Sequence, residues 1–279
     1  MYWHICCYMT SNLKMISEMK QHTLLILSLM LLSQVGYSQV SNSSRVEQKG
    51  TNNQLVNAQI GTLNMANLFQ SGDANQNTTL QYGKSNVAEV NSSGNNNVSL
   101  QSQVGQMNLL NVKQEGVGNR NNVLQVGVGN EVELIQKDRY NRGGNETTII
   151  QGGVANKAKV KQYYRGNQVF ITQVGEDNVG DIYQMGSGDV VNSKAALYQG
   201  GKGNMADIDQ YGKSQEANVT QIGVSNKASV VQKKGAGNMM NALQLGEGNV
   251  ANIDQQGDRN KSTTIQIGNR NNALVEQKQ

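Results

Sequence analysis

Glutamine side chains recur every eleven residues along most of this chain. The repeated position holds Gln at 20 of 21 sites, and Ser92 is the single substitute. A primary amide both donates and accepts hydrogen bonds, so amides stacked at a regular distance can bond to one another in a column. The spacing therefore predicts a noncovalent ladder. Its members are Gln48, Gln59, Gln70, Gln81, Gln103, Gln114, Gln125, Gln136, Gln151, Gln162, Gln173, Gln184, Gln199, Gln210, Gln221, Gln232, Gln244, Gln255, Gln266 and Gln277.

Asparagine forms a second repeated position, six residues before the Gln position. It occupies 19 of 21 sites, and the exceptions are Ser193 and Gln215. We expect these amides to form a parallel ladder of their own. They are Asn42, Asn53, Asn64, Asn75, Asn86, Asn97, Asn108, Asn119, Asn130, Asn145, Asn156, Asn167, Asn178, Asn204, Asn226, Asn238, Asn249, Asn260 and Asn271.

Glycine follows the Gln position by two residues at 17 of 20 turns, with Asp138, Tyr164 and Lys234 as the departures. Tight reversals often need a positive φ that Gly adopts freely, so this Gly is expected to end each strand. The predicted turn glycines are Gly50, Gly61, Gly72, Gly83, Gly94, Gly105, Gly116, Gly127, Gly153, Gly175, Gly186, Gly201, Gly212, Gly223, Gly246, Gly257 and Gly268.

The elements that position these amides are predicted to be short β-strands. The Asn, a small residue, an aliphatic residue and the Gln alternate with outward positions, which is typical of a half-buried strand. The aliphatic position, two before Gln, holds Val, Ile or Leu at 16 of 21 sites. Proline is absent from all 279 residues, as expected if the backbone N–H groups are needed in ladders.

Two successive strands are expected to form one structural unit of 22 residues. The residue after the Gln position is apolar or aromatic in eight of ten alternate repeats but in only three of eleven of the others. The spacing lengthens only at Gln136–Gln151, Gln184–Gln199 and Gln232–Gln244, always after a repeat of the second kind. We therefore predict an all-β, two-sheet β-solenoid of about ten and a half rungs, with one strand per sheet per rung, in-register parallel stacking and the longer loops on one edge.

Outward charges test the predicted register. Glu133, Lys159 and Asp181 occupy one position in successive rungs, and Glu131 and Lys157 occupy another. Parallel stacking would make opposite charges vertical neighbours. Unrelated charges on a solvated face remain the alternative interpretation.

Residues 1–38 are interpreted as a leader, with a secretory signal peptide at 19–38, and residues 39–279 as the repeat domain. All Cys, His and Trp residues lie in this leader. The remaining chain has 22 basic and 19 acidic residues. It therefore offers no disulfide framework, and its mild, scattered charge does not favour nucleic-acid binding.

The run from Gln151 through Asn156 to Gln162, and that from Gln244 through Asn249 to Gln255, resemble the curlin repeat of curli fibre subunits. The resemblance covers residues 42–277. It implies a secreted functional amyloid of the biofilm matrix, exported through an outer-membrane pore and assembled on the cell surface with a nucleating or major subunit. The family's export-targeting segment has almost no room between the leader and the first repeat, and the array is about twice as long as the familiar five-repeat subunits.

Self-assembly follows from the pattern itself, because it runs from Asn42 to Gln277 without atypical capping repeats. Exposed strand edges at the ends of such a stack are templates for further strands. We expect end-to-end addition into a fibril that serves biofilm matrix and adhesion. The sequence leaves open whether the chain is a major subunit or a nucleator, and which end grows.

Enzymatic function is not expected, since no catalytic residues, metal ligands, cofactor site or small-molecule site emerge from the pattern. The alternative to a fibre subunit is a non-polymerising surface β-solenoid that acts as an adhesin or binding scaffold. Its contact sites would be the longer loops Asp138–Gly144 and Ser187–Ser193. A stripe of Tyr163, Tyr164, Tyr183 and Tyr211 is a further candidate, although aromatics are ordinary strand residues.

Overall fold

The computed structural model describes residues 41–138, 143–186 and 192–278. The chain divides into Met1–Gln39 and Val40–Gln279. The leader predicted at 1–38 lies outside the described residues and stays a prediction. All strands of the described residues belong to the second unit.

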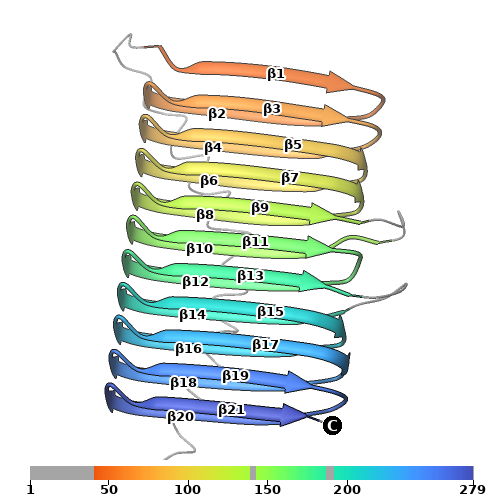
Figure 1. The fold of residues 1–279 in the computed structure, drawn as a ribbon. Helices are drawn as coiled ribbons and strands as arrows, with labels where there is room; N and C mark the ends of the chain where they lie inside the picture. Colours follow the sequence, from red (N-terminus) through yellow and green to blue (C-terminus); the bar gives the residue numbers. More distant parts are fainter. Residues whose placement is uncertain (1–40, 139–142, 187–191, 279) are drawn as a thin grey trace, which may run out of the picture. The chain divides into compact units, whose positions relative to one another are not determined.

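These strands form two parallel sheets (Figure 1). Sheet A contains β1 (Ser43–Lys49), β3 (Met65–Ser71), β5 (Val87–Asn95), β7 (Leu109–Val117), β9 (Glu131–Lys137), β11 (Lys157–Tyr163), β13 (Val179–Met185), β15 (Met205–Lys213), β17 (Lys227–Ala236), β19 (Val250–Gln256) and β21 (Asn272–Lys278). Sheet B contains β2 (Gln54–Thr62), β4 (Gln76–Lys84), β6 (Val98–Gln106), β8 (Arg120–Val128), β10 (Glu146–Val154), β12 (Gln168–Glu176), β14 (Lys194–Lys202), β16 (Glu216–Val224), β18 (Met239–Glu247) and β20 (Lys261–Asn269).

The chain alternates between the sheets, so each strand pairs with the strands two before and two after it. The register places Gln48 beside Gln70 in sheet A and Gln59 beside Gln81 in sheet B. The predicted two-sheet β-solenoid, with one strand per sheet in each 22-residue rung, is therefore confirmed. All three longer connections, β9 to β10, β13 to β14 and β17 to β18, run from sheet A to sheet B. They share one edge, as predicted.

A single register shift accompanies the shortest insertion. Between β15 and β17 the pairing passes from Gln210 to Gly212 on one strand and from Gln232 to Gly235 on the other. One extra residue on β17 is thereby accommodated as a bulge, and Lys234 in it has a φ of 54°. A bulge adds a residue without breaking the ladder on either side.

The interior is built from the residues that share the parity of Gln. In sheet A an unbroken column of aliphatic side chains, from Leu68 in β3 to Ile253 in β19, is buried. The five positions without Val, Ile or Leu all fall in sheet B: Asn57, Thr79, Gln101, Ala242 and Thr264. The burial of one large aliphatic side chain stabilises by about 1.5–3 kcal/mol. The apolar core is therefore more continuous on the sheet A side.

Polar side chains replace the aliphatic column in strands β4 to β8 of sheet B, and they bond to one another. Thr79 Oγ1 donates to Gln101 Oε1 at 3.0 Å. Asn121 Nδ2 donates to Ser99 Oγ at 2.9 Å. Buried polar groups are costly unless they are paired, and this network supplies most of the partners.

Turn glycines occupy the predicted places with one correction. Sixteen of the seventeen have a positive φ, and Gly186 directly precedes residues outside the described ranges. The prediction that Gly ends each strand is wrong in sheet B, where β2 continues through Gly61 to Thr62. Gly61 stays in register with Gly83, because a Gly with positive φ can bend the strand while its peptide groups remain in the ladder.

A second left-handed residue completes most turns, and it was not predicted. It directly precedes the ladder Asn and is often not glycine, as at Leu63 with a φ of 59° and Met107 with a φ of 54°. Such angles are unusual for bulky residues. The backbone is held there by hydrogen bonds of the ladder Asn, since the N–H and side chain of Asn64 both donate to Asn42 Oδ1.

Candidate functional site: the amide ladders and the stack ends

The Gln ladder has a uniform direction. In sheet B, Gln59 Nε2 donates to Gln81 Oε1 at 2.7 Å, and the same bond recurs between successive rungs as far as Gln244 to Gln266 at 2.8 Å. In sheet A it runs from Gln114 through Gln136 to Gln277. Each amide therefore donates toward the C-terminal end of the stack. The predicted ladder is formed.

Each Gln also ties the two sheets together. The Nε2 group donates to a backbone carbonyl of the strand that directly precedes it in the chain, for example from Gln70 to Gln54 O at 3.1 Å. The same bond joins Gln81 to Met65 O at 2.9 Å. One side chain thus bonds along the stack and across the interior, which is why Gln fits this position better than an apolar residue of similar size.

Ser92 interrupts the column without leaving its own hydroxyl unpaired. Its Oγ donates to Gln114 Oε1 at 3.0 Å. The neighbour on the other side, Gln70, keeps its bond to Gln54 O. Ser is too short to reach both neighbours, so this is a weak point in the sheet A ladder.

The Asn ladder runs in the opposite direction and fastens the turns. Asn64 Nδ2 and its backbone N–H both donate to Asn42 Oδ1, at 3.2 and 3.0 Å. Asn64 Nδ2 also reaches Ile60 O and Gly83 O, at 3.2 and 3.1 Å. These bonds join one turn to the next rung, and they fix the left-handed residue that precedes Asn64.

The two departures from Asn are accommodated differently. Gln215 maintains the pattern, because its Nε2 donates to Gly235 O at 3.0 Å and its Oε1 accepts from Asn238 Nδ2 at 3.2 Å. Ser193 has no amide to offer the preceding rung, and Asn167 Oδ1 is buried without a partner. The ladder is therefore weakest at Ser193.

Vertical ion pairs confirm the register on the outer face of sheet A. Lys159 Nζ lies 2.8 Å from Glu133 and Lys157 Nζ lies 3.1 Å from Glu131. The hydrogen bond from Glu133 raises the pKa of Lys159. Asp181 stands beside Lys159 in the register, but its pKa is raised, first by burial and then by the charge of Asp207. Such exposed pairs contribute modestly, about 0–1 kcal/mol each.

The predicted tyrosine stripe is partly formed. Tyr163 and Tyr183 have ring centroids 5.6 Å apart, and Tyr183 and Tyr211 are 5.4 Å apart, with tilted planes. Tyr164 belongs instead to a turn, with a φ of 71°. Most of the two longer loops, Asp138–Gly144 and Ser187–Ser193, lies outside the described residues, so their predicted contact role stays a prediction.

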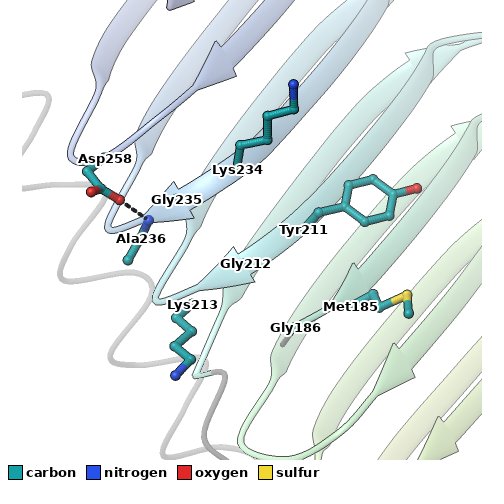
Figure 2. A pocket seen from close by; sticks show the side chains of 9 residues that line it. All are labelled: Met185, Gly186, Tyr211, Gly212, Lys213, Lys234, Gly235, Ala236 and Asp258. Atoms are coloured by element: carbon teal, nitrogen blue, oxygen red, sulfur yellow. Dashed lines mark hydrogen bonds between the residues drawn. The ribbon is translucent and has the colours of Figure 1, made fainter. Parts of the chain in front are cut away.

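One shallow depression lies where sheet A meets its turns (Figure 2). Its lining includes Met185, Tyr211, Lys213 and Lys234, and Asp258 accepts a 2.8 Å hydrogen bond from the backbone N–H of Ala236. No cluster of three or more His, Cys, Asp or Glu side chains suited to a metal ion occurs in the described ranges. The depression offers turn backbone and scattered charges, without a nucleophile and base in contact.

The ends of the described stack expose strand edges. β1 and β21 in sheet A, and β2 and β20 in sheet B, each pair on one side only within the described residues. Apolar outward side chains gather there, with Leu274 70% exposed, Ile267 69% and Val56 55%. Unpaired edges of this kind are sites at which further strands add.

Comparison with protein families gives matches in the same unit. Residues 175–212 and 246–278 match the model of the Curlin associated repeat. These two segments are curlin repeats. The curlin repeats contain strands β13 and β14, and β19 to β21. A comparison with curated proteins gave no match. In the described part of the chain, no helix has the length and apolarity needed to span a membrane.

Proposed function

We propose that this chain is a structural subunit of an extracellular, curli-like amyloid fibre that assembles end to end through the outermost strands of its stack. The observation that carries the proposal is the continuity of the hydrogen-bonded ladder. Parallel, in-register strands with matched Gln and Asn columns extend to β1 at one end and β21 at the other. An incoming stack of the same register would continue both the backbone and the amide ladders.

The energetics of one rung favour such growth. A rung buries about two large aliphatic side chains, worth roughly 1.5–3 kcal/mol each. Ordering its 22 residues costs on the order of 20–40 kcal/mol in backbone entropy. A rung is therefore stable only between neighbours, and the end rungs have a neighbour on one side within the described residues. Addition of another molecule supplies the missing side.

The biological setting follows from the curlin repeats and is part of the proposal. The chain would be secreted, with a leader removed near Gln39, and would contribute to a cell-surface fibre of the biofilm matrix that mediates adhesion. Its partners would be further copies of itself, a nucleating or major curli-like subunit, and an outer-membrane secretion pore. In this role it carries no catalytic activity, cofactor, nucleic acid or small-molecule substrate.

Fibre diffraction on the incubated chain from Gln39 onward tests the proposal. We expect reflections near 4.8 and 10 Å, a thioflavin response, and acceleration by preformed seeds. A β-rich protein that stays monomeric at high concentration for days would overturn the proposal and favour the surface adhesin or binding scaffold.

A further inference from the structure

The two ends of the described stack are out of step by one strand. Because the chain alternates between sheets, the position that would follow β21 lies in sheet B, beside β20 (Figure 1). At the other end the first described strand, β1, belongs to sheet A. A copy that continues the alternation must therefore place its own β1 in sheet B of the molecule before it.

We infer that successive copies in the fibre are related by a half turn about the stack axis, so that β1 of one copy pairs with β20 of the next and β2 pairs with β21. This inference rests on the proposed end-to-end assembly and names its junction. Sheet A of one molecule is then continuous with sheet B of the adjacent molecule. An unrotated copy would pair β1 with β21 and leave the neighbouring position in sheet B empty. β20 and β2 would then lie about 9.6 Å apart rather than about 4.8 Å.

The hydrogen bonds of Gln48 support the half turn. All nineteen other ladder Gln donate Nε2 to a carbonyl of the preceding strand, as Gln59 does to Ser43 O at 3.0 Å. Among the described residues Gln48 bonds only to Gln70. In the rotated junction β21 of the adjacent copy takes the place of the preceding strand, and Asn272 O occupies the position of the missing carbonyl. In the unrotated junction that position stays empty.

The outward charges also favour the half turn. Glu47 and Lys49 form an ion pair at 2.7 Å within β1, and Glu276 and Lys278 form one at 3.1 Å within β21. Both pairs flank the ladder Gln in the same way, so an unrotated junction would stack Glu on Glu and Lys on Lys. Like charges directly opposite each other in a sheet are destabilising.

Rotation replaces those contacts with apolar ones. Glu276 then stands beside Ala58 of the adjacent copy, and Lys278 beside Ile60. Leu274 and Val56, which are 70% and 55% exposed at the free ends, become neighbours. Burial of these two side chains stabilises the rotated junction specifically.

Engineered disulfides between the outward positions test the junction. The chain from Gln39 onward has no cysteine, and adjacent parallel strands place Cα atoms at about 4.8 Å, within the range that a disulfide bridges. Arg45→Cys serves as the common partner. Combined with Thr263→Cys it reports the β20–β1 contact of the half turn, and combined with Leu274→Cys it reports the β21–β1 contact of the unrotated junction. All three positions are exposed.

Fibres of each double variant are oxidised and separated on denaturing gels without reductant. We expect covalent multimers from Thr263→Cys with Arg45→Cys, and single chains from Leu274→Cys with Arg45→Cys and from each single variant. The reverse pattern, or fibres with cross-β diffraction that link in neither variant, would overturn the half turn while leaving the proposed function intact. Absence of fibres from the unmodified chain would overturn both.

Discussion

Gln151 Nε2 donates to Gln173 Oε1 at 2.8 Å, and both side chains are fully buried. Gln173 in turn donates to Gln199 Oε1, Lys157 O and Asn178 O, at 2.8, 2.8 and 3.2 Å. One side chain thus connects three rungs and both sheets. The strength of the fold is expected to lie in such residues as much as in the aliphatic columns.

Gln173→Ala is therefore expected to destabilise the stack by on the order of 2–4 kcal/mol, because it leaves buried partners unpaired and opens a cavity. Gln168→Ala is the matched control, since this Gln belongs to the same strand but faces outward and is exposed. Guanidinium denaturation followed by circular dichroism measures both. Equal midpoints for the two variants would show that the ladder bond contributes nothing beyond strand propensity.

Ser92→Gln is expected to stabilise the protein by about 1 kcal/mol, since it completes the interrupted sheet A ladder between Gln70 and Gln114. The change in the denaturation midpoint is the measurement. Gln70 Nε2 would gain the acceptor that the ladder provides elsewhere. A lower midpoint would mean that the interior around Ser92 has closed over the shorter side chain, so that the added volume is strained.

The turns carry a second, steric requirement. Gly83 has a φ of 122°, and a Cβ placed on it would lie 1.9 Å from Gly105 O of the next rung. Gly83→Ala is therefore expected to cost at least about 2 kcal/mol and to slow fibre growth, through backbone strain and the clash together. Gly152→Ala is the control, because its Cβ would meet nothing within 4 Å. Equal loss in both variants would place the effect in the lost flexibility of glycine alone.

Much of this architecture could be predicted because the repeat states it many times over. Twenty Gln in one register allow few other pairings, and the one-sided insertions after Gln136, Gln184 and Gln232 distinguish the two sheets. The left-handed φ at Leu63 and Met107 could not be predicted from those residues, since neither prefers that conformation. It is imposed by the bonds of the Asn that comes next in the chain, and the regular recurrence of that Asn was the available signal.

The polar part of the interior was missed for a related reason. Thr79 and Gln101 stand at the aliphatic position and departed from the pattern without an evident compensation. Their partners lie one rung apart, and Thr79 Oγ1 meets Gln101 Oε1 at 3.0 Å. Only the 22-residue register brings such departures together. Comparing each departure with its neighbour 22 residues away, rather than with the average repeat, would have found this pair.

The acidic residues on the outer face of sheet A predict a pH effect of definite sign. Burial, and then the charge of Asp207, raise the pKa of Asp181 above its ordinary 3.8. The protonated form is thus favoured in the folded state. The stability that this provides is present below pH 3.8 and is lost as pH rises through the higher pKa of the folded protein.

Asp181→Asn removes this loss. Relative to the unmodified chain, the variant is expected to gain more stability at pH 6 than at pH 3, as measured by denaturation midpoints at both values. Asp73→Asn should do the opposite, because hydrogen bonds from Thr51 lower the pKa of Asp73, and the stability that they give is lost as pH falls. If both variants kept the pH dependence of the unmodified chain, neither carboxyl group would be coupled to folding.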